Sequence, residues 1–298
     1  MTGGAHGGPN RAPRRPAVAG SFYDANPSRL DAMVATLLAG ARAQPRPPGL
    51  DPSAVAGLLV PHAGLVYSGA VAALAWALAG EIAPATIILA GTDHEARAAG
   101  VGVWAGGPWR TPLGDVAIDE DVADEIAALG PPFERDDYAH FGEHSLEVQL
   151  PLLMRACPEA KIVALAVSPR LTRHAEAGRA LARVITRWRN AGERLLLVAS
   201  SDMAHYPPAD VCEIVDADLL EPLLRLDADD LRARDARVTR EARSGVVCGM
   251  CGIDPTRVAL VALTELGARR GILLGAATSA DAGGDPGRTV GYAAAAFM

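Results

Sequence analysis

Short, nearly continuous apolar runs alternate with helical patterns along this chain, and this alternation most limits how it can fold. Three of the runs, Gly57–Val60, Ala85–Leu89 and Arg194–Ser200, each end at a polar tip. Strands of a sheet covered on both faces have this composition, because neither of their faces meets water. The pattern predicts an α/β fold, a single three-layer α/β/α domain with a mostly parallel or mixed central sheet.

Helical spacing and apolar runs also predict the remaining elements. We expect helices from Pro27, through Ala70–Leu78, and over Glu120–Leu129, Ser145–Cys157, Arg173–Asn190 and Pro255–Leu266, with two or three more in the charged stretch Asp216–Arg243. Further strands are expected at Val101–Trp104, Val116–Ile118, Ile162–Val167, Gly271–Ser279 and Thr289–Phe297. Residues 1–15 are rich in Gly, Pro and Arg and are expected to form a disordered tail, so residues 16–298 would be one domain.

Composition limits the classes of partner. Half of the 298 residues are hydrophobic, and the formal net charge is −7, which argues against a dedicated nucleic-acid binder because such proteins present a basic face. No run of about eighteen apolar residues is evident, so no membrane span is expected. Four cysteines without a secretion signal favour reduced thiols in the cytoplasm over a disulfide framework.

Potential metal ligands follow three of the apolar segments. His62 lies in Pro-His-Ala-Gly after Gly57–Val60, His94 ends Gly91-Thr92-Asp93-His94, and a Cys-x-x-Cys pair, Cys248 and Cys251, follows Val246-Val247. Two imidazoles and a thiolate suit iron, copper or zinc, whereas magnesium and calcium prefer oxygen ligands. If the strands share one sheet, their carboxyl ends would bring these side chains to one ion.

A second group of polar residues lies at the tip after Arg194–Ser200. Asp202 and His205 are three residues apart, so the carboxylate would orient the imidazole as a general base if the tip begins a helical turn. An ordinary helix N-cap at Ser200 or Ser201 explains the same residues equally well. His144 is expected either to start a helix or to face a pocket. Asp93 is more typical of a turn or cap, though it remains a candidate ligand. His6, His140 and His174 are assigned no role.

Six ordered segments together resemble the Memo family, whose bacterial and archaeal members are often labelled AmmeMemoRadiSam system protein B. The segments are Arg15–Tyr23, Pro61–Gly69, Arg110–Gly114, Glu143–Glu147, Ser200–Tyr206 and Val290–Tyr292. The resemblance implies a fold similar to that of class III extradiol ring-cleavage dioxygenases, with a metal-binding pocket.

The resemblance also implies which residues form that pocket. His62 and His94 match the family's two histidines, although Thr92 stands where the family has proline. Cys251 matches the family's cysteine better than Cys248, because it precedes Gly-x-x-Pro. Asp202 and His205 match the tip beside the metal, and His144 matches the Glu-His-Ser segment.

Three functions are consistent with these residues. The first is a redox protein or oxidoreductase that holds iron or copper at His62, His94 and Cys251 and acts on an unidentified small molecule, with His205, Asp202 and His144 in catalytic roles. The second is a non-catalytic metal- or ligand-binding adaptor, since the family label implies radical-SAM and AMMECR-type protein partners. The third and weaker one is a zinc site that activates water.

Overall fold

The centre of the molecule is an eight-stranded mixed sheet. The computed structural model describes residues 12–242 and 245–298, and the strand order is β6-β3-β7-β2-β8-β1-β10-β9. The strands are β1 (Gly57–Val60), β2 (Thr86–Thr92), β3 (Val101–Val103), β6 (Phe133–Arg135), β7 (Lys161–Val167), β8 (Leu195–Ser200), β9 (Gly271–Thr278) and β10 (Gly291–Phe297). β7, β2, β8 and β1 run parallel to one another, whereas β10 is antiparallel to β1 and to β9.

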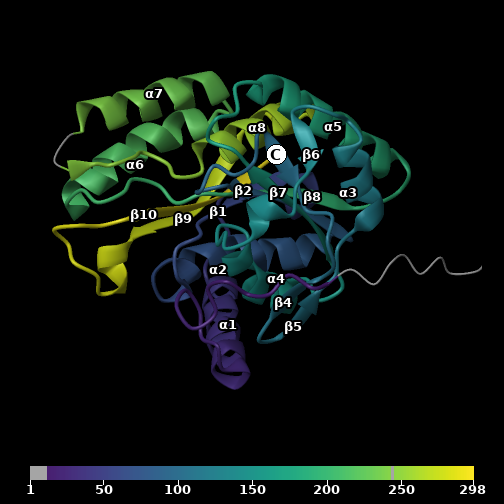
Figure 1. The fold of residues 1–298 in the computed structure, drawn as a ribbon. Coiled ribbons are helices and arrows are strands. Elements are labelled where there is room, and N and C mark those ends of the chain that lie inside the picture. Colours follow the sequence, from purple (N-terminus) through teal and green to yellow (C-terminus); the bar gives the residue numbers. More distant parts are fainter. Residues whose placement is uncertain (1–11, 243–244) are drawn as a thin grey trace, which may run out of the picture.

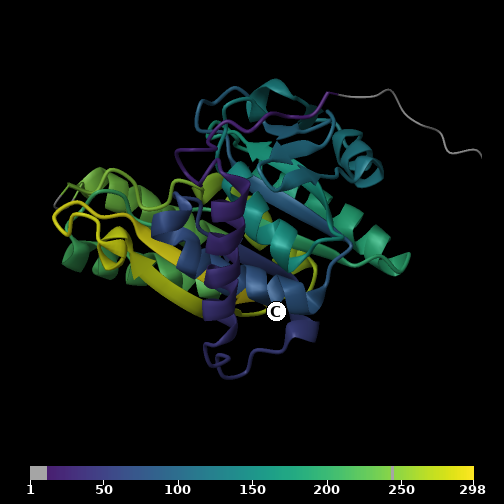
Figure 2. The ribbon, with the colours of Figure 1, turned by 90° about the horizontal axis from the view of Figure 1, so that it is seen from below.

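Helices cover both faces of this sheet. On one face lie α1 (Pro27–Arg42), α2 (Leu65–Ile82) and α4 (Leu150–Ala156), and on the other α3 (Glu120–Ala127), α5 (His174–Asn190), α6 (Ala209–Leu224), α7 (Ala228–Glu241) and α8 (Ile253–Glu265) (Figure 1). Figure 2 shows the purple α1 and the green α6 and α7 on different sides of the sheet. Successive strand residues point to opposite faces, so Leu58 joins the core under α2 while Leu59 joins the core under α5 and α8. The three-layer α/β/α prediction is therefore confirmed.

Two predicted elements between residues 110 and 160 differ markedly from the structure. The expected strand Val116–Ile118 lies mostly outside a strand, because the chain turns tightly at Gly114 (φ 130°) and pairs β4 (Trp109–Thr111) with β5 (Gly114–Val116) in a separate hairpin. The expected helix Ser145–Cys157 starts later, as a 3₁₀ turn at Glu147–Gln149 followed by α4. The backbone N–H groups of residues 144 and 145 donate to the side chain of Glu143, which holds this segment outside the helix.

The described part of the chain begins before the predicted domain boundary at residue 16. Residues 1–11 of the predicted tail lie outside the described residues, but Arg14 is buried and its Nη1 lies 2.6 Å from Oε2 of Glu147. The same carboxylate accepts hydrogen bonds from the backbone N–H groups of Ala17 and Val18 and from the hydroxyl of Tyr23. This buried ion pair fastens the N-terminal segment to the domain.

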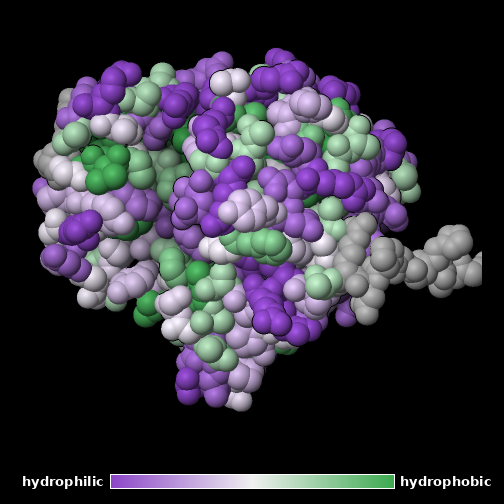
Figure 3. Space-filling model, in the orientation of Figure 1, coloured by the Kyte–Doolittle hydropathy of each residue, from purple (hydrophilic) through white to green (hydrophobic). Residues whose placement is uncertain are grey.

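α2 is long and apolar enough to cross a membrane by length and composition, yet 61% of it is buried inside the protein. It packs on β9, β10 and α1, as the core helix of a globular domain does. Hydrophilic side chains cover much of the face shown in Figure 3, and hydrophobic ones gather over α6, where Ile214 is 70% exposed. The expected cytoplasmic location stays a prediction.

Candidate metal centre

Three adjacent parallel strands deliver the predicted site residues to one edge of the sheet. β8 lies between β2 and β1, so the tips after these strands are neighbours. His62 follows β1, His94 follows β2, and Asp202 and His205 follow β8. The prediction that these strands share a sheet and end together is therefore confirmed, and the site lies where open α/β sheets place their ligands.

Cys251 reaches this edge from a loop before α8. The expectation of a strand at Val246-Val247 is wrong, since neither residue lies in a strand and only the following Cys248 forms an isolated bridge, with His205. The loop approaches β8 so closely that a Cβ atom on Gly252 would lie 2.5 Å from the carbonyl oxygen of Ser200. The hydroxyl of Thr92 donates to the Cys251 carbonyl at 2.9 Å. Glycine and threonine thus fix the cysteine beside both strand ends.

The hydrogen bonds of His62 define its tautomer. The Ser200 hydroxyl gives its single proton to the Ser145 carbonyl, so toward Nδ1 of His62, at 3.0 Å, it acts as an acceptor. Nδ1 therefore carries the proton, and Nε2 keeps its lone pair, 3.0 Å from Sγ of Cys251. Burial, followed by the neighbouring histidines, lowers the pKa of His62 well below its usual value, which keeps the imidazole neutral.

His94 is oriented by Glu143, a residue that the sequence reasoning did not assign to the site. The carboxylate lies 2.9 Å from Nδ1 of His94 and also accepts the backbone N–H of His94 at 2.8 Å. Burial opposes the charge on Glu143, but the hydrogen bond from His94 and those from backbone N–H groups lower the pKa of this carboxyl. An ionised carboxylate only accepts, so Nδ1 of His94 donates and Nε2 is left for a ligand. Burial lowers the pKa of His94, but the hydrogen bond to Glu143 and the negative charge of Glu143 raise it above its usual value.

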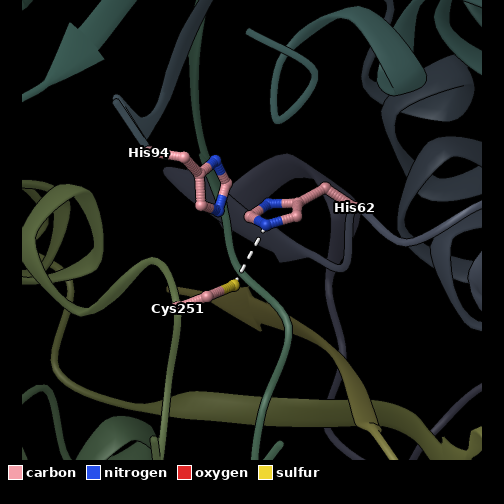
Figure 4. A group of neighbouring side chains, drawn as sticks. All are labelled: His62, His94 and Cys251. Atoms are coloured by element: carbon pink, nitrogen blue, oxygen red, sulfur yellow. Dashed lines mark hydrogen bonds between the residues drawn. The ribbon is translucent and has the colours of Figure 1, made fainter. Parts of the chain in front are cut away.

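The three predicted metal ligands converge in space. One ligand atom from each of His62, His94 and Cys251 lies within 4.8 Å of the other two, and Figure 4 shows the two rings and the sulfur facing a common point. Burial and the charge of Asp202 raise the pKa of the Cys251 thiol well above its usual value. A metal cation would reverse this effect, because it stabilises the thiolate. The donor set, two imidazoles and a thiol, therefore fits a transition metal or zinc.

Asp202 does not orient His205 as predicted. Its Oδ1 accepts the backbone N–H groups of His62 and Ala63, at 2.6 and 3.2 Å, so it holds the tip of β1 instead. Nδ1 of His205 lies 2.8 Å from the carbonyl oxygen of Met203, which fixes the ring with Nδ1 protonated. Residues 201–204 are irregular rather than the start of a helix. Burial raises the pKa of Asp202 to about 7 and lowers the pKa of His205.

His144 faces the pocket, the second of its two predicted arrangements. Its ring stacks on that of His94, with centroids 4.5 Å apart and planes inclined by 16°, and burial lowers its pKa to about 4. Asp93 has the structural role that the sequence favoured, since its Oδ2 accepts the backbone N–H of Ala98 at 2.7 Å. Cys248 lines the same pocket as Cys251 but belongs to none of the potential ligand clusters of the described residues.

The histidines without an assigned role are less exposed than their sequence context indicated. His140 is fully buried, and its Nε2 donates to the Gly102 carbonyl at 3.0 Å. His174 is 7% exposed, and its Nε2 lies 2.7 Å from Oδ1 of Asp254. Both have structural partners away from the strand tips. His6 lies outside the described residues.

A pocket of about 730 Å³ surrounds the converging side chains. Phe22, Val66, Tyr67, Val247, Val290 and Tyr292 form much of its apolar wall. His62, His94, His144, Asp202, His205 and Cys251 supply polar groups at one end. The size and the mixture of apolar wall and converging polar groups are typical of small-molecule sites.

Comparison with known proteins identifies the family of this chain. A family model described as Memo-like protein matches residues 14–296. A MEMO1 family protein from Ignicoccus hospitalis is 35% identical over 290 residues, which cover 95% of this chain and 98% of that protein. A MEMO1 family protein from Aquifex aeolicus is 35% identical over 289 residues, with coverages of 96% and 99%. A crystal structure of an uncharacterized protein from Escherichia coli K12 aligns at 17% identity and a TM-score of 0.43, over 81% of this chain and 99% of that one. The family and sequence matches extend over nearly the whole chain, which therefore belongs to the Memo-like protein family.

Proposed function

We propose that this protein is a metal-dependent redox protein that holds iron or copper at His62, His94 and Cys251 and acts on a small molecule in the adjoining pocket. The observation that carries the proposal is the orientation of the three side chains. Ser200 and Glu143 occupy the Nδ1 atoms of the two histidines, so both Nε2 atoms are left for a ligand beside Sγ of Cys251. Partners that fix ring orientation in this way are typical of metal-ligating histidines.

The surrounding residues supply binding and proton handling. Iron or copper at this position would contribute one-electron redox chemistry and open coordination positions for a substrate. His205 has its Nδ1 engaged by the Met203 carbonyl, so its neutral Nε2 is available to accept a proton from a bound molecule. Asp202 holds the His62 backbone through Oδ1, and His144 packs on His94, so both act by positioning a ligand residue.

Zinc is the weaker alternative for the same ligand set. Three protein ligands and an open position would permit activation of water. The thiolate and imidazole donors suit zinc, copper and iron alike, so elemental analysis of the bound metal is what distinguishes them.

A second candidate, a non-catalytic metal- or ligand-binding adaptor, shares the pocket but not the proton-handling role of His205. Radical-SAM and AMMECR-type proteins are the proposed partners in that case. Co-purification of such proteins with the tagged chain from its own host would favour the adaptor. Substrate-dependent oxygen consumption that is lost in His205→Gln, with metal content retained, would favour the redox enzyme.

Elemental analysis of protein purified anaerobically from its own host is the direct test. We expect near-stoichiometric iron or copper in the wild type and its loss in His62→Ala and in Cys251→Ala, because each substitution removes one of three ligands. Cys157→Ala is the matched control, since Cys157 is a buried cysteine directly after α4 and belongs to none of the potential ligand clusters of the described residues. Its metal content should equal that of the wild type.

The outcomes separate the proposals. Retention of metal in both ligand variants would refute the ligand set, provided that circular dichroism shows both to be folded. Zinc in place of iron or copper would refute the redox assignment and favour water activation. Protein that carries no metal when isolated and takes up none on titration would favour the adaptor.

A further inference from the structure

The pocket beside the candidate metal centre has one strongly basic side chain in its lining, Arg288. Among the described residues that line it, the others are apolar, aromatic, small, acidic, histidine or cysteine. Arg288 is exposed and forms no ion pair with the rest of the described chain. Its side chain therefore lines the pocket without an acidic partner among the described residues.

The guanidinium group is nevertheless held in place. It stacks over the ring of Tyr206, with Cζ 4.2 Å from the ring centroid, which is a favourable cation–π distance. Arg288 also ends a tight turn, since its backbone N–H donates to the Asp285 carbonyl and the N–H of Gly287 donates to Oδ1 of Asp285. A planar, stacked guanidinium is prearranged for two parallel hydrogen bonds to a carboxylate.

The backbone under this ring is strained, and the segment before β10 holds it in this conformation. Tyr206 has a φ of 74°, in the left-handed region that non-glycine residues rarely adopt. Its N–H donates to the carbonyl of Thr289, and the N–H of Thr289 donates to the carbonyl of Pro207. Thr289 directly follows Arg288, so the same hydrogen bonds that hold the strained tyrosine also hold the arginine beside it. Strain maintained by surrounding structure is frequent at binding sites.

The acidic residues of the pocket are already engaged. Oδ1 of Asp202 accepts two backbone N–H groups, and Oδ1 of Asp285 accepts one. These bonds direct the carboxylates toward backbone. Meanwhile Phe22, Tyr67 and Val290 offer apolar and aromatic contact along the wall. The pocket thus combines an apolar body site with one fixed cation.

We propose that Arg288 is a specificity-determining residue that binds the carboxylate of a small, predominantly apolar ligand in this pocket. The inference rests on the proposed function, because it takes the cavity beside His62, His94 and Cys251 as the site of action. It adds the chemical class of the ligand: an organic anion with one carboxylate and an apolar body that fits a volume of about 730 Å³.

Calorimetric titration with benzoate tests the inference, using the full chain with its metal content measured in each preparation. Benzamide is the neutral probe of matched size, and inorganic phosphate is the anion without an apolar body. We expect benzoate to bind the wild type and to bind Arg288→Met about tenfold or more weakly, the effect of one charged hydrogen-bonding partner. Arg288→Lys should retain part of the affinity, because lysine keeps the charge and loses the bidentate geometry. Arg183→Ala, an exposed arginine on α5, is the control and should bind as the wild type does.

Each contrary result overturns a defined part of the inference. Equal benzoate affinity in the wild type and in Arg288→Met, or absence of binding in both, would remove the role of Arg288. Equal affinity of the wild type for benzamide would show that charge is not recognised, and equal affinity for phosphate would refute the need for an apolar body. Arg288 does not belong to the metal cluster, so Arg288→Met should retain the metal. If the protein contains metal but benzoate binds the wild type and Arg288→Met with equal affinity, this inference alone is refuted. If the protein takes up no metal but benzoate binding still depends on Arg288, the metal proposal alone is refuted.

Discussion

Replacement of Arg14 by methionine should destabilise the fold by about 3–5 kcal/mol, the usual cost of removing one member of a buried ion pair. Arg14 and Glu147 are 1% and 0% exposed at their side chains, and the Arg14 guanidinium also stacks over Trp109 at 4.1 Å. The substitution removes the ion pair and the hydrogen bonds to the carbonyls of His140 and Glu143. Glu147 then remains buried without its cation.

The remaining contacts of Glu147 limit how much stability the Arg14→Met variant loses. Glu147 still accepts hydrogen bonds from the backbone of Ala17 and Val18 and from the hydroxyl of Tyr23, so its charge keeps part of its compensation. Methionine fills much of the space of the arginine stem, so no large cavity is added. The expected loss therefore lies in the lower half of the range, at about 3 kcal/mol.

Urea unfolding, followed by tryptophan fluorescence and by circular dichroism, measures this loss. Arg46→Met is the control, because Arg46 and Glu81 form an exposed pair with side chains 50% and 49% exposed. An exposed pair contributes about 0–1 kcal/mol. If Arg14→Met lowers the free energy of unfolding no more than Arg46→Met does, the ion pair does not hold the N-terminal segment against the domain, and the prediction is refuted. The double variant Arg14→Met/Glu147→Met should be more stable than the sum of the single losses implies, since it leaves no unpaired charge.

Three further predictions concern the site and its surroundings. Glu143→Gln should weaken metal binding by roughly ten- to a hundredfold, because His94 loses its anionic partner; unchanged affinity in a competitive chelator titration would contradict this role. Gly252→Ala should destabilise the fold by about 1–3 kcal/mol and lower metal occupancy, since the new methyl group would lie 2.5 Å from the Ser200 carbonyl oxygen. Thermal unfolding and elemental analysis measure the two effects, and wild-type values for both would show that the loop can accommodate the methyl group. Burial lowers the pKa of His140 from 6.5 to about 3, so between these pH values the unfolded chain binds a proton that the folded chain does not. The free energy of unfolding should therefore fall by up to about 5 kcal/mol as the pH drops from about 6.5 toward 3. His140→Gln should flatten this pH dependence, and an unchanged slope would exclude His140 as its source.

The layered fold was predictable because buried parallel strands leave a strong compositional signal. Apolar runs ending in polar tips gave the central strands β1, β2 and β8 and therefore the edge at which His62 and His94 meet. The hairpin of β4 and β5 was missed, because a three-residue strand carries too little periodicity to separate it from a loop.

The convergence of the proposed ligands was predictable from sequence, but the groups that orient them were not. His62, His94 and Cys251 stand in recognisable local motifs, whereas Glu143 reaches His94 across 49 positions and Ser200 reaches His62 across 138. Such partners depend on tertiary packing, which no local spacing encodes. The Glu143-His144-Ser145 segment was the sequence feature that could have identified Glu143, but its histidine was the more obvious candidate for the site.

Thr92 connects two parts of the candidate site. Hydrogen bonds restrain the tip after β2, because the Thr92 hydroxyl donates to the Cys251 carbonyl and the Thr92 carbonyl accepts from the Ser145 hydroxyl. The N–H of Asp93 donates to the Val167 carbonyl, which continues the pairing of β2 with β7 one residue further. The threonine therefore ties the tip that bears His94 directly to the loop that bears Cys251.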